Sequence, residues 1–271
     1  MDNICSTHSA ALSVIIPIYN EEASLRAVLD ELVAELESFA ARAAFAELSK
    51  FAGIETSAER GCAFEIIAVD DGSSDASPAI LRGFAQAHRG AARVFALDRN
   101  CGQSAAFWAG IQQARGAVIV LMDADGQNTP TDIPRLVSEL ASSGADIVCG
   151  FRAHRRDTFS KRLASRAANS FRRAILRDGV IDTGCSLKAF KAPVLKRLQC
   201  WDGMHRFLPV LALAQGAKLA QIPVGHRARF AGKSKYTNFG RLKRTVADLL
   251  GVRWLASRTR QFEVEEMENE F

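Results

Sequence analysis

The chain has 271 residues, 48% of them hydrophobic, which is enough for one large α/β domain with a substantial core. It has no run of about eighteen apolar residues and no basic-then-apolar secretory signal at its start, so we expect no membrane span and a cytoplasmic location. The six cysteines lack the spacing of a zinc site or a disulfide framework, and the net charge of +5 predicts an anionic partner.

The first strand and the first helix are predicted after a flexible leader, residues 1–11. Residues 12–18 are almost continuously apolar, which is typical of a strand buried on both faces, and Tyr19-Asn20-Glu21 follows at its C-terminal end. From residue 24 to 36, apolar residues recur at helical spacing and predict an amphipathic helix. We interpret residues 37–62 as a helical insert. It is either an idle insertion or a packing surface for a partner chain, so a homo-oligomer remains open.

Strands and helices then alternate up to residue 122. The predicted strands and helices of this part are strands at 64–69, 93–97 and 118–122 and helices at 79–88 and 105–114. Such alternation indicates right-handed βαβ units. We therefore predict a Rossmann-like α/β architecture with a parallel sheet for the first half of the chain. The glycine fingerprint of dehydrogenases and the phosphate loop of P-loop NTPases are both absent from the sequence, which disfavours these two classes.

Two of the predicted strands end in acidic residues. Asp70 and Asp71 follow the strand at 64–69, and Asp123 and Asp125 follow the strand at 118–122. Ligands of open α/β sheets bind at the carboxyl ends of strands, and alternate residues of an extended segment point the same way, so Asp123 and Asp125 can converge on one point. These two carboxylates, with Gln127 as a neutral oxygen donor, suit Mg²⁺ or Mn²⁺. For a lone Asp-x-Asp, a turn or a helix cap is the commoner explanation.

Basic residues are concentrated in the second half of the chain. After a predicted helix at 133–142 and a strand at 146–149, arginines and lysines follow one another from residue 152 to 177 beside an apolar stripe. This pattern suits binding of phosphate, nucleic acid or an anionic membrane, and equally a solvated helix face.

The C-terminal third has one predicted strand and one long predicted helix. Residues 221–224 are predicted as an edge strand, because Pro223 has no N–H to donate to a neighbouring strand. The glycine- and lysine-containing loop at 226–236 can fold over phosphate oxygens. A basic amphipathic helix at 238–262, suited to a membrane interface, precedes an acidic tail at 263–271.

Four segments resemble, in the same order, the motifs of the family 2 glycosyltransferases with the GT-A fold, and among them the dolichyl- and polyprenyl-phosphate sugar transferases. The segments are Pro17-Ile-Tyr-Asn-Glu21, Val69-Asp-Asp-Gly-Ser-Ser-Asp75, Met122-Asp-Ala-Asp-Gly-Gln127 and Arg229-Phe-Ala-Gly-Lys-Ser-Lys-Tyr236. The likeness extends from about residue 12 to about residue 255 and places the GT-A domain at 12–237. It implies an α/β fold with a Rossmann-like, mixed, mostly parallel sheet flanked by helices. Ser186-Leu187-Lys188 departs from the family, in which an aromatic residue and an arginine are common.

The resemblance implies roles for individual residues. Those implied for the nucleotide-sugar site are Pro17, Tyr19, Glu21, Val69, Asp70, Asp71, Asp123, Ala124, Arg152 and Lys188. Those implied for the metal are Asp123, Asp125 and Gln127. Those implied for the acceptor phosphate are Arg166 and Ser234, and those implied for catalysis at the departing diphosphate are Asp125, Arg229 and Lys235.

The implied function is transfer of a sugar, with inversion, from a UDP- or GDP-sugar to a polyprenyl phosphate such as dolichyl or undecaprenyl phosphate. The enzyme would depend on Mg²⁺ or Mn²⁺ and would lie peripherally on the anionic inner face of the membrane. A lipid phosphate is largely ionised near neutral pH, since its second pKa is about 6, so this acceptor needs no strong catalytic base.

Two alternatives remain open. A saccharide or protein hydroxyl acceptor would need a carboxylate base, for which Asp182 and Asp202 are the candidates. A non-enzymatic module could instead bind anions or nucleic acid through the basic stretch. Because that module leaves the acid-ended strands unexplained, we expect no nucleic-acid partner.

Overall fold

The computed structural model describes residues 10–53, 63–153, 170–228 and 238–260. The strands are β1 (Ala10–Ile18), β2 (Phe64–Asp70), β3 (Ala92–Ala96), β4 (Gly116–Leu121), β5 (Ile147–Arg152), β6 (Lys188–Lys191) and β7 (Leu219–Val224). The helices are α1 (Glu22–Ala40), α2 (Ala43–Phe51), α3 (Ser77–Ala87), α4 (Gln103–Gln113), η1 (Pro130–Asp132), α5 (Ile133–Ser142), α7 (Ala192–Lys196), η2 (Met204–Arg206), α8 (Leu208–Ala214) and α9 (Asn238–Arg258). None of the helices in these ranges is both long and apolar enough to cross a bilayer.

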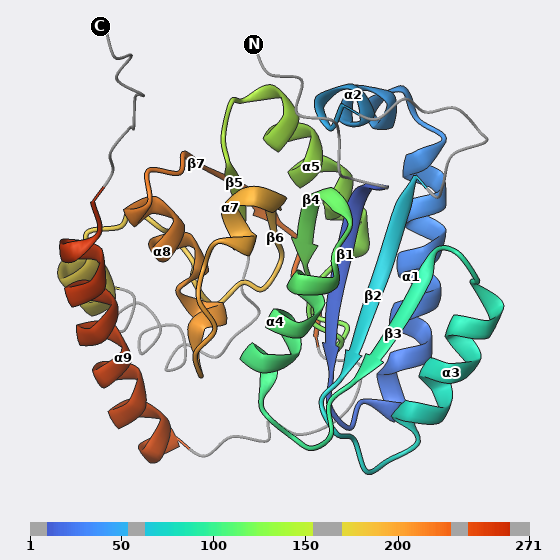
Figure 1. Ribbon diagram of the computed structural model, residues 1–271, viewed down its shortest axis with the longest axis horizontal. Helices are drawn as coiled ribbons and strands as arrows, with labels where there is room; N and C mark the ends of the chain where they lie inside the picture. Colours follow the sequence, from blue (N-terminus) through green and yellow to red (C-terminus); the bar gives the residue numbers. More distant parts are fainter. Residues whose placement is uncertain (1–9, 54–62, 154–169, 229–237, 261–271) are drawn as a thin grey trace, which may run out of the picture.

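The strands of the described ranges form one sheet in the order β3-β2-β1-β4-β6-β5-β7 (Figure 1). β6 runs antiparallel to both of its neighbours, β4 and β5, while the other neighbouring strands pair in parallel. The predicted mixed, mostly parallel sheet is therefore confirmed. β7 lies at one edge of the sheet, as Pro223 predicted.

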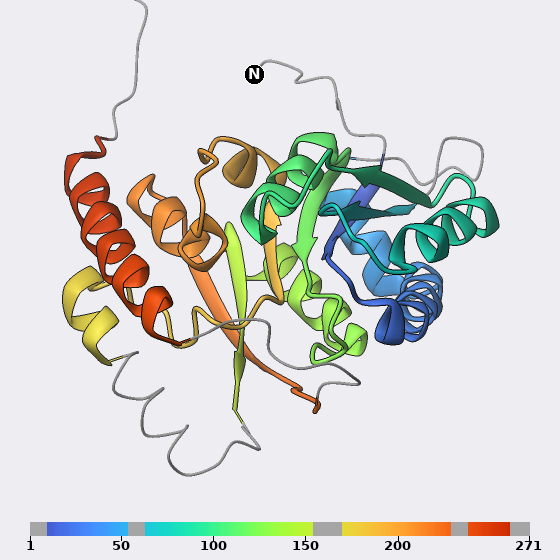
Figure 2. The same ribbon diagram turned by 90° about the horizontal axis from the view of Figure 1, so that it is seen from below.

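Helices cover both faces of the sheet (Figure 2). α1, α3 and α5 pack on one face, and their buried apolar residues join those of the strands in one core cluster. α4, α7, α8 and α9 contribute to a second core cluster on the other face. Every residue of β1 is buried, which explains why its sequence is apolar except for Ser13.

A polar network connects four neighbouring strands of the sheet, from β3 to β4. Glu65 is 4% exposed, and its carboxylate accepts hydrogen bonds from Ser13 Oγ at 2.6 Å and from the Arg115 N–H at 2.6 Å. Arg93 pairs with the other carboxylate oxygen at 2.9 Å. The network joins β1, β2, β3 and the start of β4. Their carboxyl ends consequently stand side by side at the opposite end of the sheet.

Several element boundaries differ from the predicted ones. Ala10 and Ala11 are buried in β1, so the predicted leader of residues 1–11 was too long. Residues 37–40 of the predicted insert complete α1, and α2 packs against α5. Phe39 of α1 and Phe45 of α2 are in edge-to-face contact, with their ring centroids 5.2 Å apart. The rest of the insert, residues 54–62, lies outside the described residues.

Candidate active site

The loops after β1 and β2 interlock at the carboxyl edge of the sheet. Asn20 adopts a positive φ of 53°, its N–H donates to Ser73 Oγ at 2.9 Å, and its side chain accepts the Ser74 N–H at 2.7 Å. The Glu21 N–H donates to Ser77 Oγ at 3.0 Å. Tyr19 is 38% exposed beside this junction. The first two predicted motifs therefore form one surface, which includes the partly exposed Tyr19 side chain.

Asp71 anchors the loop that precedes α4. Its carboxylate accepts the N–H groups of Cys101 at 2.7 Å and Gly102 at 2.9 Å, and the side-chain amide of Asn100 at 3.0 Å. Gly72 has a φ of +69°, and a Cβ there would lie 2.6 Å from the backbone of residues 99 and 100. Burial raises the pKa of Asp71, and the two backbone hydrogen bonds oppose that rise. The role of Asp71 at the nucleotide remains a prediction.

Asp123 and Asp125 lie where β4 ends, and like charges face each other there. The Gln103 side-chain amide donates to Asp123 Oδ1 at 2.7 Å, and the Gln127 N–H donates to Asp125 Oδ1 at 3.0 Å. Burial, and secondarily the charge of Asp125, raise the pKa of Asp123 from 3.8 to about 6. The Asp123 carboxylate is therefore in a position that favours a neighbouring positive charge.

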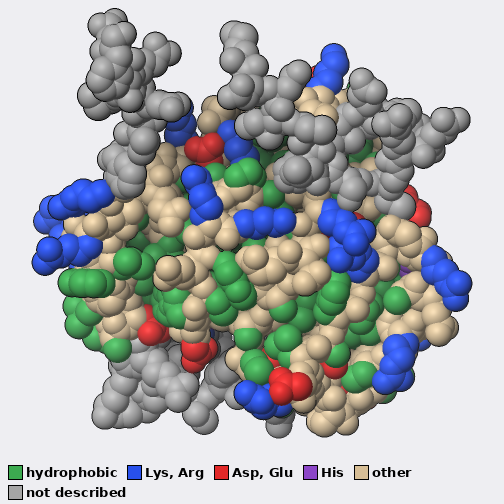
Figure 3. Space-filling model, viewed as in Figure 1, with side chains coloured by type: hydrophobic (Ala, Val, Ile, Leu, Met, Phe, Trp, Pro, Cys, Tyr) green, Lys and Arg blue, Asp and Glu red, His purple; other side chains and the backbone are tan. Residues whose placement is uncertain are grey.

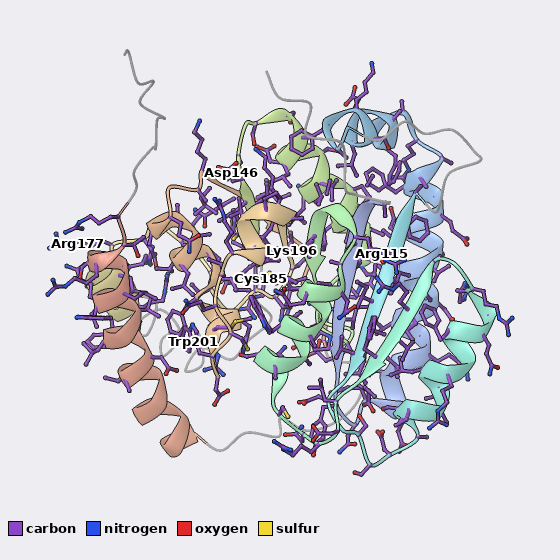
Figure 4. The ribbon with its side chains drawn as sticks, in the orientation of Figure 1. Arg115, Asp146, Arg177, Cys185, Lys196 and Trp201 are labelled. Carbon is purple, nitrogen blue, oxygen red and sulfur yellow. The ribbon has the colours of Figure 1, made fainter. Side chains whose placement is uncertain are left out.

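Residues around β6 approach Asp123 from the other side. The Ser186 hydroxyl donates a hydrogen bond to Asp123 and accepts one from the Asn128 amide at 2.6 Å. Lys188 is only 2% exposed, and its ammonium donates to the carbonyl of Cys185, which Figure 4 labels near the middle of the molecule. The positive charge of Lys188 lowers the pKa of Asp123. The structure thus places Lys188 near Asp123, and its role at the nucleotide-sugar remains a prediction.

Arg152, at the end of β5, forms a bidentate ion pair with Asp182. Arg152 Nε and Nη2 donate to the two carboxylate oxygens at 2.7 and 2.8 Å, and the Gly184 N–H donates to Asp182 Oδ1 at 3.2 Å. Asp182 is 5% exposed. Both oxygens of Asp182 accept hydrogen bonds from Arg152, an arrangement that does not favour Asp182 as the base for a hydroxyl acceptor. Asp202 is exposed and remains available for that role.

The chain after β7 is fastened beside the Asp123–Gln127 segment. The Gly225 N–H donates to Asp132 Oδ2 at 2.7 Å, and the Arg227 N–H donates to the Gln127 carbonyl at 3.0 Å. These bonds bring the start of the basic loop to the site. Four predicted site residues lie outside the described residues: Arg166, Arg229, Ser234 and Lys235.

The donors at the end of β4 fit a hard divalent cation. Asp123 and Asp125 supply carboxylates, and Gln127 has an amide oxygen. In the part of the chain that the structure describes, no group of three or more His, Cys, Asp and Glu side chains could hold a metal. A cation at this pair would therefore take its remaining oxygens from water or from a bound ligand, as Mg²⁺ commonly does.

Sequence reasoning missed Gln103, Asn128 and Ser186. Gln103 and Ser186 contact Asp123, and Asn128 contacts Ser186, but neither spacing nor residue type marks these neutral side chains as members of the site. Only the contact between distant segments reveals these residues.

Comparison with known proteins decides the family. The model of "Glycosyl transferase family 2" matches residues 13–198. The chain belongs to glycosyl transferase family 2. The predicted glycosyltransferase identity is therefore confirmed, and the matched residues include the β1, β2 and β4 motifs together with Arg152 and Lys188.

Curated relatives of this family 2 glycosyltransferase include proteins named for lipid-phosphate acceptors. The dodecaprenyl-phosphate galacturonate synthase of Rhizobium johnstonii is 36% identical over 247 residues, which are 90% of this chain and 67% of that protein. The undecaprenyl-phosphate 4-deoxy-4-formamido-L-arabinose transferase of Pseudomonas aeruginosa is 38% identical over 239 residues, 88% of this chain and 64% of that protein. The chain thus spans about two thirds of the length of these relatives.

Solved structures share the fold at lower identity. The glucosyl-3-phosphoglycerate synthase of Mycobacterium tuberculosis in complex with Mn²⁺ and UDP-glucose has a TM-score of 0.62 and 20% identity, over 90% of this chain and 79% of that one. Its complex with Mn²⁺, UDP and glucosyl-3-phosphoglycerate also has a TM-score of 0.62 and 20% identity, over 92% and 80% of the two chains. The predicted GT-A fold is confirmed.

Proposed function

We propose that this glycosyltransferase moves a sugar, with inversion, from a UDP- or GDP-sugar to a polyprenyl phosphate, with Mg²⁺ or Mn²⁺ at Asp123 and Asp125. The observation that carries the proposal is the convergence of these two carboxylates with Lys188 and Arg152 at the carboxyl edge of the sheet. The names of the relatives, which include dodecaprenyl and undecaprenyl phosphate, support the acceptor class.

Different residues of the site are assigned to the nucleoside, to the cation and to the departing diphosphate. The exposed ring of Tyr19 and the buried carboxylate of Asp70 contact the nucleoside, with Pro17, Glu21 and Val69 shaping that end of the site. Asp123, Asp125 and Gln127 would hold the cation, which when bound would supply Lewis-acid stabilisation of the departing diphosphate. Lys188 adds a fixed positive charge close to the same place, and the buried setting strengthens its effect.

The acceptor accounts for the absence of an assigned base. In the transfer, a phosphate oxygen forms a bond to the anomeric carbon while the bond from that carbon to the diphosphate oxygen breaks. The attacking oxygen is already ionised near neutral pH, so no proton needs to be removed. The pairing of Asp182 with Arg152 agrees with this chemistry, because it leaves that carboxylate unsuited to act as a base.

α9 provides a surface suited to the membrane that holds such an acceptor. Leu249 and Val252 are buried against the domain, whereas Leu250, Trp254 and Leu255 are exposed by 58%, 63% and 42%. Hydrophobic and cationic side chains lie next to each other along this edge (Figure 3), and Arg177, labelled in Figure 4, lies near α9. We define the α9 face as Leu250, Arg253, Trp254, Leu255 and Arg258. It combines apolar area with positive charge, as interfacial helices on anionic lipids do.

The test is transfer of radiolabelled sugar from a panel of UDP- and GDP-sugars to undecaprenyl phosphate, followed by organic extraction of the product. Wild-type protein should form lipid-linked product with Mn²⁺ or Mg²⁺ and lose that activity in EDTA. Asp125→Ala should reduce transfer by a factor of roughly a thousand or more, because charge stabilisation at the diphosphate is lost.

Asp30→Asn is the control, because this carboxylate is exposed on α1 and is not one of the proposed metal ligands. It should transfer sugar at the wild-type rate. Full activity in EDTA, or in Asp125→Ala, would contradict the metal assignment. Equal activity with a soluble saccharide and no lipid would favour the hydroxyl acceptor instead, with Asp202 as the base to test.

A further inference from the structure

The first turn of α4 is held between two anchors, one of which comes from β2. The Asp71 carboxylate accepts the Gly102 N–H through both oxygens, at 3.1 and 2.9 Å, and the Cys101 N–H at 2.7 Å. Gly102 has a φ of +90° and directly precedes Gln103, the first residue of the helix. The position of Gln103 is consequently tied to the end of β2.

The second anchor comes from the segment around η2. Ser104 is 2% exposed; its hydroxyl lies 2.7 Å from His205 Nδ1 and accepts the Gly203 N–H at 3.0 Å. The His205 ring also lies 6.4 Å from that of Phe107, one turn further along α4. The helix therefore can neither slide along its axis nor rotate without breaking buried contacts at Ser104.

Gln103 projects from this clamped turn onto Asp123. Its amide nitrogen lies 2.7 Å from Asp123 Oδ1. An amide is a neutral donor, so it fixes the orientation of the carboxylate without cancelling the negative charge that a cation requires. A lysine at this position would compete with the cation, and an apolar residue would leave the Asp123 side chain without this restraint.

We propose that Gln103 is a positioning residue for Asp123, and that Asp71 and the Ser104–His205 pair act through Gln103 by fixing the first turn of α4. The inference rests on the proposed function, in that it takes Asp123 as a metal ligand. It also gives Asp71 a different task from the nucleotide contact that the resemblance implies. Asp71 then affects metal binding at a distance, through the loop of residues 100–102.

Metal affinity measured without turnover tests the proposal. Mn²⁺ alone is titrated into the purified full chain, and the free ion is followed by electron paramagnetic resonance. Gln103→Met keeps the length of the side chain but removes the donor, and it should weaken Mn²⁺ binding by roughly 10- to 100-fold, the usual effect of losing a residue that orients a metal ligand. Gln112→Met, on the exposed side of the same helix, should bind Mn²⁺ as the wild type does.

Two further variants test whether the anchors of α4 affect binding of the metal or binding of the nucleotide. Asp71→Asn and Ser104→Ala should each weaken binding of Mn²⁺ alone, and Asp71→Asn combined with Gln103→Met should be little worse than Gln103→Met, because both changes act through one contact. If Asp71→Asn leaves Mn²⁺ binding unchanged but weakens binding of UDP and GDP, its assignment to the clamp is wrong.

The outcomes distinguish this inference from the function on which it rests. Wild-type affinity for Mn²⁺ in Gln103→Met would overturn the positioning role and leave the metal site intact. A wild-type chain that does not bind Mn²⁺, with or without UDP or GDP, would overturn the metal role of Asp123 and this inference together. Circular dichroism of each variant identifies loss of fold, and Gln103→Met, at a partly exposed site, provides the decisive comparison.

Discussion

At the scale of single residues, the Asp123 carboxyl group lowers the stability of the metal-free protein. Its pKa is 3.8 in an unfolded chain and about 6 in the fold, with burial as the main cause and the charge of Asp125 as the next. Between these two values the folded protein binds more protons than the unfolded chain does, so stability decreases as pH rises through that window. At about 1.4 kcal/mol per pKa unit, the cost above pH 6 approaches about 3 kcal/mol.

Asp123→Asn should therefore stabilise the metal-free protein while it abolishes transfer. We expect the free energy of unfolding to rise by about 1–3 kcal/mol at pH 7.5 and to change little near pH 4, because asparagine does not ionise. Urea denaturation in EDTA at several pH values measures this difference. A variant that is less stable than wild type at pH 7.5 would contradict the prediction.

Asp146→Asn is a control that should change the stability at pH 7.5 in the opposite direction, because the pKa of Asp146 is lowered in the fold. Burial opposes ionisation of Asp146, but hydrogen bonds from Lys191 and from the Lys218 N–H outweigh it, and the pKa of Asp146 is lowered. The stabilisation is present above pH 3.8 and is lost as pH falls below that value. Its replacement should destabilise the protein at pH 7.5, and the difference from wild type should shrink in acid.

A second prediction at this scale concerns Glu65, remote from the site. Glu65→Ala removes the acceptor shared by Ser13, Arg93 and the Arg115 N–H, and leaves a half-buried guanidinium without its carboxylate. Breaking a buried pair in this way costs about 3–5 kcal/mol. Urea denaturation should show that loss, whereas Glu37→Ala, on the exposed face of α1, should change stability by less than about 0.5 kcal/mol.

At the scale of elements, α9 should determine membrane affinity without supporting the catalytic centre. Trp254→Ala should weaken co-sedimentation with vesicles containing phosphatidylglycerol roughly tenfold, because an indole ring that is 63% exposed no longer inserts. Thermal stability should stay unchanged, since Leu249 and Val252 form the contact with the domain.

Phe51→Ala is the control for α9, because Phe51 is an exposed aromatic residue of α2, which lies far from α9 in Figure 1. It should leave vesicle binding intact. Binding that is insensitive to Trp254→Ala and to salt would exclude the α9 face as the membrane contact.

Most elements could be predicted because their own residues encode them. β1 and β4 are largely buried on both faces and show as almost continuously apolar runs, and α5 begins and ends where its apolar spacing does. The antiparallel insertion of β6 between β4 and β5 could not be predicted. The residues of β6 themselves carry no local signal for strand direction.

At the scale of the whole molecule, the site brings together the ends of β1, β2, β4 and β5 with the loop before β6. Acidic residues at strand ends could be recognised, because parallel strands bring their carboxyl ends to one edge. The hydrogen bond from Gln103 to Asp123, and the pairing of Arg152 with Asp182, join segments that are 20 and 30 residues apart. Such pairings follow from packing and not from periodicity, so they required the structure.

The whole molecule should be stabilised by a cation and a nucleotide together. A ligand that binds only the native state adds about 2.7 kcal/mol at a concentration of one hundred times its Kd. For a chain of this size that corresponds to a rise in Tm of roughly 5–10 °C. Thermal denaturation with Mn²⁺ plus UDP, and with Mn²⁺ plus GDP, measures the shift, and the larger one identifies the base. Asp125→Asn should abolish the shift, because the diphosphate then lacks its cation. An equal shift in that variant, or in EDTA, would place nucleotide binding outside the β4 end and remove the physical basis for the proposed transfer.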